Sequence, residues 1–290
     1  MSGAWTAIGV PIDSVGRAGG TEGAPAALRE HGLLGRIGAR DHGDLDVDIR
    51  DETRDPATGV VGIGRVLAMT AAVRTAVRDA VAAGARPLVL GGCCTLLPGA
   101  LGGVRDAIGA FGLAYVDGHV DVYDGRTSPT GEGADMPVGV AFGRDPQPWV
   151  QAAGGASLTP EDVVVLGARD PEEAEDIAPL LAGELAALTV RGPGELRAAG
   201  PGVAGAEAAE RLDRFWVHLD VDVLDEAAMP ATDYLMPGGL DWDEVAALLA
   251  PLGAAPGLVG LSLGCVNPDK DPDGRYAERT CDLLAGALGG

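Results

Sequence analysis

The sequence predicts a three-layer α/β/α fold around a central, mostly parallel β-sheet. Two observations lead to this prediction: short apolar runs alternate with longer helical patterns, and the apolar runs are rich in valine and leucine. Such runs are typical of strands buried on both faces, which pair in parallel through right-handed helical crossovers. No repeat or long linker divides the chain, so we expect a single domain over residues 1–290.

Each expected element is a run of one of these two kinds. The expected strands are Trp5–Val10, Pro87–Leu90, Gly112–Val116, Asp162–Leu166, Phe215–Leu219 and Leu258–Leu263. The expected helices are Pro25–Leu33, Val66–Ala83, Thr95–Ile108, Pro171–Leu181, Gly194–Leu212, Asp241–Leu249 and Arg275–Leu288. Pro25 and Pro171 open their helices, where a missing N–H costs no hydrogen bond. Functional side chains are expected at the carboxyl ends of the parallel strands.

The composition restricts the partners and the surroundings of the protein. Asp and Glu number 43 against 21 Lys and Arg, which gives a formal charge of −22. This charge repels nucleic acid and anionic membranes and attracts cations. The four cysteines fit neither a zinc ribbon nor a disulfide framework. Since no leader and no membrane-spanning run is present, we expect a cytoplasmic protein with no nucleic-acid or membrane partner.

Two clusters of ionisable residues stand at strand ends: one directly follows the expected strand Gly112–Val116, and the other closes the expected strand Phe215–Leu219. The first contains Asp117, His119 and Asp121, and the second contains His218, Asp220 and Asp222. Alternate residues of an extended chain share a face, so the members of each cluster can converge.

Any one of these aspartates alone fits a helix cap or a solvated loop. Two clusters at strand ends favour a metal centre instead, because burying so many ionisable groups is costly without compensating charge. Their oxygen and nitrogen atoms suffice for two divalent cations about 3.5–4 Å apart that share a water.

The segment Leu90-Gly91-Gly92-Cys93-Cys94-Thr95 is a third strand end that opens into a helix. Its glycines permit a tight turn. A phosphate cradle is disfavoured, because no lysine follows and the loop is too short for a P-loop. As one corner of a metal site the segment offers Cys94, with Cys93 as the weaker alternative. A buried inert cysteine is the interpretation that we prefer for Cys93.

These motifs, in this order, resemble those of the arginase/agmatinase (ureohydrolase) family over nearly the whole chain. Gly9-Val10-Pro11 is similar to the G-x-P opening, and residues 20–29 to G-x-x-x-G-P-x-x-[IL]-R. The three core segments stand where the family has G-G-D-H-S, D-A-H-x-D and S-x-D-x-D-x-x-D, and Pro237-Gly238-Gly239-Leu240 resembles the P-G-G-L that follows.

The resemblance implies an arginase-like fold with two bound metal ions and a homo-oligomer. By position, Asp117 and Asp220 would bridge the metals. Asp121 and Cys94 would complete one metal site, and His119 and Asp222 the other. Manganese is expected. Zinc and iron are the alternatives, because a Cys94 thiolate is a softer ligand than the family's histidine.

The chain departs from the family pattern at four positions. Cys94 replaces a histidine ligand, and Ala134 stands where a histidine proton shuttle is expected, a role that Glu132 or Asp135 would have to take over. Cys265 stands where a glutamate grips the substrate guanidinium, which argues against ordinary arginine hydrolysis. His218 replaces a small residue. Four roles are open for it: a partner of the bridging aspartate, a substitute base, a ligand that compensates for the lost histidine, or a structural histidine of the strand.

The substrate contacts are the least defined part of the resemblance. Glu172 is the nearest match to the acids that hold a substrate ammonium group in the family, and a solvated acid of the first helical turn is the alternative. The cysteine at position 94 also resembles a branch of the family that hydrolyses N-hydroxylated arginine in antibiotic pathways.

The leading hypothesis is a binuclear metal-dependent hydrolase that cleaves a C–N bond of a cationic guanidino or amidino compound, with Asp121 or a nearby acid as the proton donor. One alternative is a non-catalytic relative with a binding or regulatory role, which the lost histidine, glutamate and ligand would favour. A mononuclear amide hydrolase is the other. The number of metal ions per chain separates the three.

Overall fold

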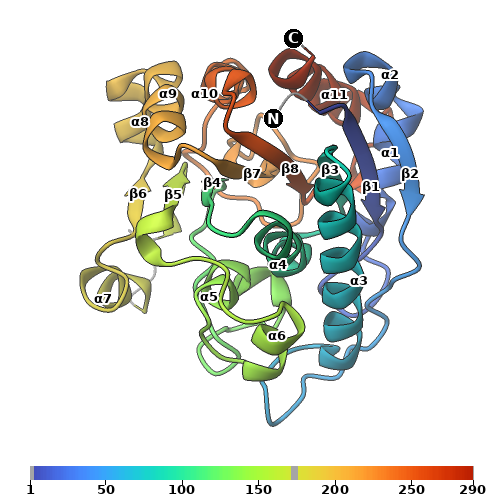
Figure 1. The fold of residues 1–290 in the computed structure, drawn as a ribbon, viewed down its shortest axis with the longest axis vertical. Coiled ribbons are helices and arrows are strands. Elements are labelled where there is room, and N and C mark those ends of the chain that lie inside the picture. Colours follow the sequence, from blue (N-terminus) through green and yellow to red (C-terminus); the bar gives the residue numbers. More distant parts are fainter. Residues whose placement is uncertain (1–2, 171–175, 290) are drawn as a thin grey trace.

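Eight strands form one sheet in the computed structural model, which describes residues 3–170 and 176–289 (Figure 1). The strands are β1 Trp5–Val10, β2 Arg40–Asp44, β3 Arg86–Gly91, β4 Gly112–Val116, β5 Val163–Leu166, β6 Thr189–Arg191, β7 Phe215–Asp220 and β8 Leu258–Gly264. Their order is β2-β1-β3-β8-β7-β4-β5-β6, and all neighbouring strands run parallel. The predicted fold class is confirmed.

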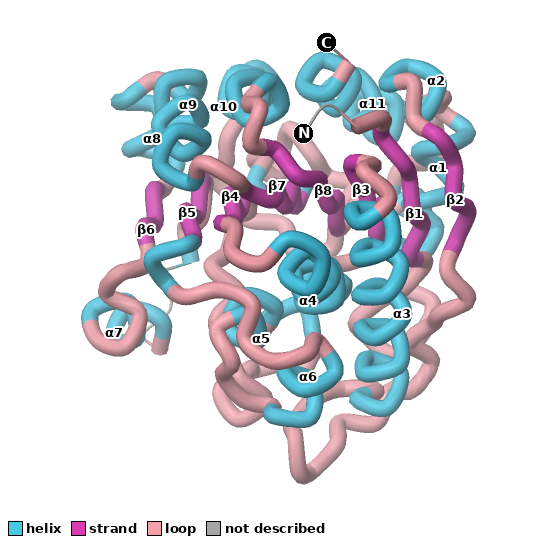
Figure 2. Tube along the Cα trace, viewed as in Figure 1, coloured by secondary structure: helices cyan, strands magenta, loops and turns pink. Residues whose placement is uncertain are grey.

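Helices cover both faces of this sheet, as Figures 1 and 2 show. One layer contains α3 Ile63–Ala82, α4 Leu97–Ile108, α5 Pro137–Ala141 and α6 Gln147–Ala152. The other contains α1 Ala24–Glu30, α2 Leu33–Ile37, α8 Pro193–Ala199, α9 Pro201–Leu212, α10 Trp242–Ala254 and α11 Arg275–Leu288. Helix α7 Ile177–Ala182 lies near β6 at the side of the molecule (Figure 1).

The pattern of apolar residues explains this arrangement. Strands β4, β7 and β8 are buried along their whole length, which is why their sequences are mostly apolar. Helix α3 buries Val66, Met69, Val73 and Val77, whose spacing of three or four residues places them on one face.

The structure corrects several predicted boundaries. Strand β2 was not predicted because its sequence, Arg-Asp-His-Gly-Asp, is charged, and β6 was not predicted because it is only three residues long. The expected helix over residues 194–212 is two helices, since Gly200 adopts φ 85° between α8 and α9. The expected helix from Pro25 to Leu33 ends early, and Gly32 separates α1 from α2 in a left-handed conformation. Of the expected helix over 171–181, residues 171–175 lie outside the described residues.

The longest helix, α3, has 20 residues. Within residues 3–170 and 176–289, no helix combines the length and the apolar character that crossing a membrane requires.

Candidate metal centre

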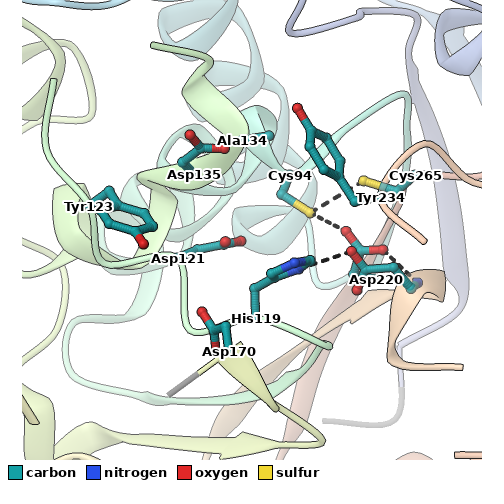
Figure 3. Close-up of a pocket in the computed structure, with 11 residues that line it drawn as sticks. Cys94, His119, Asp121, Tyr123, Ala134, Asp135, Asp170, Asp220, Tyr234 and Cys265 are labelled. Carbon is teal, nitrogen blue, oxygen red and sulfur yellow. Dashed lines mark hydrogen bonds and ion pairs between the residues drawn. The ribbon is translucent and has the colours of Figure 1, made fainter. Parts of the chain in front are cut away.

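Four central strands direct the predicted site residues toward one point at the carboxyl edge of the sheet. Cys94 follows β3, and the segment from Asp117 to Asp121 follows β4. His218 and Asp220 lie on β7, and Cys265 follows β8. Because these strands are adjacent in the order β3-β8-β7-β4, residues up to 171 positions apart in the chain come into contact (Figure 3).

The first group of potential metal donors consists of Cys94, Asp117, His218 and Asp220. All four residues are buried, and their donor atoms lie within 4.8 Å of one another. The Cys94 Sγ atom is 2.7 Å from Asp220 Oδ2, 3.1 Å from His218 Nε2 and 4.0 Å from Asp117 Oδ2. This set offers sulfur, nitrogen and oxygen ligands to one cation.

The second group consists of Asp117, His119 and Asp222. His119 Nδ1 is 3.1 Å from Asp222 Oδ2 and 3.6 Å from Asp117 Oδ1. The other oxygen of Asp222, Oδ1, accepts a hydrogen bond from the Gly118 backbone N–H at 3.0 Å. Asp117 belongs to both groups and therefore stands between the two prospective cation positions.

Asp121 lies beside these groups with its carboxylate directed toward Tyr115. The Tyr115 hydroxyl donates a hydrogen bond to Asp121 Oδ2. Asp121 adopts φ 53°, a left-handed conformation that aspartate tolerates better than most residues. It is a member of neither donor group among the described residues, so its role as a ligand stays a prediction.

The electrostatics of the cluster indicate a deficit of positive charge. Burial and the neighbouring Asp222 raise the pKa of Asp117 to about 6. Burial and the charges of Asp222 and Asp117 raise the pKa of Asp220 well above its usual value. Burial alone would lower the pKa of His119, but Asp222 and Asp117 outweigh it and raise that pKa. Divalent cations would relieve this repulsion, so the donor set fits bound metal.

A narrow cavity of about 60 Å³ opens onto both donor groups (Figure 3). Its lining combines members of the two groups with three more acids, two tyrosines, an alanine and a second cysteine: Cys94, His119, Asp121, Tyr123, Ala134, Asp135, Asp170, Asp220, Asp222, Tyr234 and Cys265. A small polar molecule that enters this cavity reaches the donor atoms directly.

Comparison with known proteins assigns nearly the whole chain to one protein family. The model of the arginase family matches residues 4–289. The chain belongs to the arginase family. This membership confirms the predicted family and the assignment as a hydrolase, and the donor groups agree with the binuclear metal centres of arginases.

Individual arginases match the chain over nearly its full length. The arginase of Bacillus caldovelox is 29% identical over 298 residues, covering 97% of each chain. The arginase of Brevibacillus brevis is 26% identical over 289 residues, covering 97% of this chain and 96% of the relative. The solved native structure of the Bacillus caldovelox arginase superposes with a TM-score of 0.90 at 25% identity, covering 99% of both chains.

Within this arginase fold, the two predicted proton-transfer acids occupy different places. Asp135 lines the cavity, and its Oδ2 accepts hydrogen bonds from the hydroxyls of Ser128 and Thr130, both at 2.6 Å. Glu132 lies outside the cavity lining, where it accepts from Ser14 at 2.7 Å. Burial raises the pKa of Glu132, and Tyr234 hydrogen-bonds the same carboxylate. Asp135 is therefore the better placed of the two to contact a ligand.

The remaining predicted residues also divide into those that line the cavity and those that do not. Ala134 and Cys265 line the cavity, in the positions where the family pattern led us to expect a histidine and a glutamate. His218 lies behind Cys94 within the first donor group and is not in the cavity lining, which favours a ligand over a substitute base. Glu172, predicted to hold a substrate ammonium group, lies outside the described residues.

Sequence reasoning missed four residues around the site. Tyr115 was missed because it reads as one more apolar position of a buried strand. Tyr123 and Tyr234 reach the cavity from loops that carry no periodic pattern. Asp170 was overlooked in favour of Glu172. It lies only a few residues after the end of strand β5, where a site acid is expected.

Proposed function

We propose that this chain hydrolyses a C–N bond of a cationic guanidino or amidino compound, using two divalent cations held by the two donor groups. The observation that supports the proposal most is that the two groups share Asp117 and that members of both groups line one cavity in an arginase-family fold. When bound, the two cations would lower the pKa of a water molecule and so supply hydroxide near neutral pH.

The protein's own residues would bind and orient the substrate. Asp135 and Asp170 give the cavity wall a negative charge that attracts an amidinium group, and the overall charge of −22 supports the same preference. Asp121, on the same wall, is proposed to pass a proton to the leaving amine, with Asp135 as the alternative donor.

Cys265 shapes the proposed substrate preference. A thiol cannot form the charge-assisted pair that a carboxylate forms with a guanidinium group. We therefore propose a guanidino or amidino compound other than unmodified arginine, with an N-hydroxylated guanidino compound as the first candidate. Manganese is the proposed metal, and zinc and iron are the alternatives.

The test combines metal content with product release. Protein purified without added metal is analysed by elemental mass spectrometry, then assayed with guanidino and N-hydroxyguanidino compounds for urea or hydroxyurea. We expect two metals per chain and release of one of these products. One metal without urea would favour a mononuclear amide hydrolase. Folded protein that binds no Mn²⁺, Zn²⁺ or Fe²⁺ would overturn the mechanism and favour a binding role.

Asp117→Asn provides the residue-level test, because Asp117 is the donor common to both groups. We expect the substitution to remove bound metal and to lower kcat/KM more than about 100-fold, beyond the loss typical of residues that only support a ligand. Asp241→Asn is the matched control. Asp241 is the N-cap of α10, a position where asparagine serves equally well, so metal content and activity should be retained. Equal losses in both variants would contradict the proposal.

A further inference from the structure

Three of the four departures from the family pattern meet at one place in the structure. Cys94, His218 and Cys265 come from β3, β7 and β8, yet they surround the same carboxylate, that of Asp220. Cys94 Sγ is 3.7 Å from Cys265 Sγ, 3.1 Å from His218 Nε2 and 2.7 Å from Asp220 Oδ2. Cys265 also hydrogen-bonds Asp220. Figure 3 shows the Cys94 sulfur between the Cys265 sulfur and this carboxylate, joined to both by dashed lines.

The separation of the two sulfur atoms suits a shared cation. With metal–sulfur bonds of about 2.3 Å and tetrahedral angles, two thiolate ligands lie about 3.8 Å apart. The 3.7 Å between Cys94 Sγ and Cys265 Sγ is close to this value. A disulfide would need about 2.05 Å and hence a movement of both side chains.

The backbone holds Cys265 in this position in an unusual conformation. Its φ of 67° lies in the left-handed region, which a cysteine seldom adopts. Its N–H donates a hydrogen bond to the Gly92 carbonyl at 2.8 Å, and so connects it to the loop that carries Cys94. Conformations of this kind persist where the surrounding structure fixes them, often at ligand sites.

A hydrogen bond on the side away from Cys94 fixes the ring of His218, as is usual for a metal-bound histidine. Its Nδ1 is 2.7 Å from Ser262 Oγ, which in turn accepts a hydrogen bond from Trp216 Nε1 at 2.9 Å. Its ring stacks on Tyr115, with 5.1 Å between the ring centroids. These contacts leave Nε2 facing Cys94. An outer hydrogen bond that fixes the ring is characteristic of metal-bound histidines.

We propose that Cys265 joins Cys94, His218 and Asp220 of the first donor group in a thiolate-rich site that binds Zn²⁺ in preference to Mn²⁺. The shared Asp117 lies between this site and a second one with His119 and Asp222, which retains the usual hard ligands. The proposal rests on the metal-dependent function above and makes its two sites chemically unequal. Thiolate and imidazole ligands select zinc, whereas carboxylates suit manganese. In this arrangement Cys265 has become a metal ligand in place of a substrate contact.

The first experiment needs no variant. The full-length protein, loaded with one equivalent of Zn²⁺ in the presence of excess Mn²⁺, is examined by X-ray absorption at the zinc edge. We expect zinc to be retained with two sulfur neighbours. Zinc displaced by manganese, or zinc without sulfur neighbours, would overturn the proposal.

Co²⁺ then serves as a spectroscopic probe of the individual cysteines. Thiolate ligation gives an intense charge-transfer absorption in the near ultraviolet, and Cys265→Ser should reduce its intensity per cobalt to roughly half, since one of two thiolates remains. Cys265→Asn is a second variant that tolerates the left-handed backbone. Cys93→Ser is the matched control, because Cys93 Sγ contacts Thr95 Oγ1 at 3.2 Å and, unlike Cys94 and Cys265, Cys93 does not line the cavity. Its spectrum should equal that of the wild type.

The outcomes separate this proposal from the proposed hydrolase. Urea release with two manganese ions and no sulfur–cobalt absorption would leave the hydrolase standing and overturn the thiolate site. Sulfur–cobalt absorption that Cys265→Ser halves, without hydrolysis of any guanidino compound, would support the thiolate site and count against the hydrolase. Equal spectra for wild type and Cys265→Ser would exclude Cys265 as a ligand.

Discussion

Tyr115 supports the site through one hydroxyl group. It is fully buried and donates to Asp121, so its removal leaves a buried carboxyl group without that donor. We expect Tyr115→Phe to lower the free energy of unfolding by about 1–3 kcal/mol, the usual cost of an unsatisfied buried group. Urea denaturation of the metal-free protein measures this change. Tyr123→Phe, at a half-buried tyrosine that lines the cavity, should change the free energy of unfolding by less than about 0.5 kcal/mol. Equal changes in the two variants would refute the role of Tyr115.

Asp170 gives the site a measurable pH dependence. Burial raises its pKa from 3.8 to about 6, so its carboxyl group destabilises the fold once it ionises. The contribution is favourable below pH 3.8 and is lost as the pH rises through about 6. Asp170→Asn cannot ionise, yet it still offers an oxygen to the Val120 N–H.

The stability of Asp170→Asn relative to the wild type should therefore increase across this pH window and level off above it. Urea unfolding of both proteins in a chelator, at a series of pH values, tests this expectation. A difference that does not change with pH would show that Asp170 titrates normally.

At the scale of elements, glycines of α4 set its distance from α3. A Cβ atom on Gly103 would lie 2.5 Å from the Arg74 carbonyl oxygen of α3, closer than real contacts allow. We expect Gly103→Ala to lower the free energy of unfolding by about 1–3 kcal/mol through overpacking. Gly64→Ala in α3 meets open space and should instead raise it by about 0.5–1 kcal/mol. Thermal and urea denaturation of both variants check the opposite signs.

The sequence predicted the central elements better than the peripheral ones. Strands β4 and β7 are buried on both faces, and their apolar runs had almost the right bounds. Strand β2 forms through backbone pairing with β1 while its side chains stay largely exposed, so composition gave no signal. The break at Gly200 also escaped notice, because a single glycine is compatible with a continuing helix.

The sequence predicted which residues form the site better than it predicted how they are arranged in space. Alternation along the chain brought together the aspartates of each cluster, because strand periodicity is local. The approach of Cys265 to Cys94 depends on the adjacency of β3 and β8 and on a left-handed residue, neither of which the chain order reveals. The single domain, the homo-oligomer and the cytoplasmic location remain predictions.

At the scale of the whole molecule, the charge of −22 opposes compaction. Raising the ionic strength from 0.01 to 0.1 M shortens the screening length from about 30 to about 10 Å. We expect the Tm of the metal-free protein at neutral pH to rise over this step, as scanning calorimetry would show. Near pH 4.3, the isoelectric point, the same step should leave Tm almost unchanged. A similar rise at both pH values would point to a salt effect unrelated to net charge.

The charged character of β2 has a consequence for solubility. In the part of the chain described, β2 closes one side of the sheet with β1 as its only strand neighbour. An unpaired edge strand of this kind is a template on which other chains can add strands and form aggregates. This edge carries solvated charge from Asp41 and Asp44, which both form ion pairs with Arg29. The segment that composition least identified as a strand thus protects the sheet from intermolecular growth.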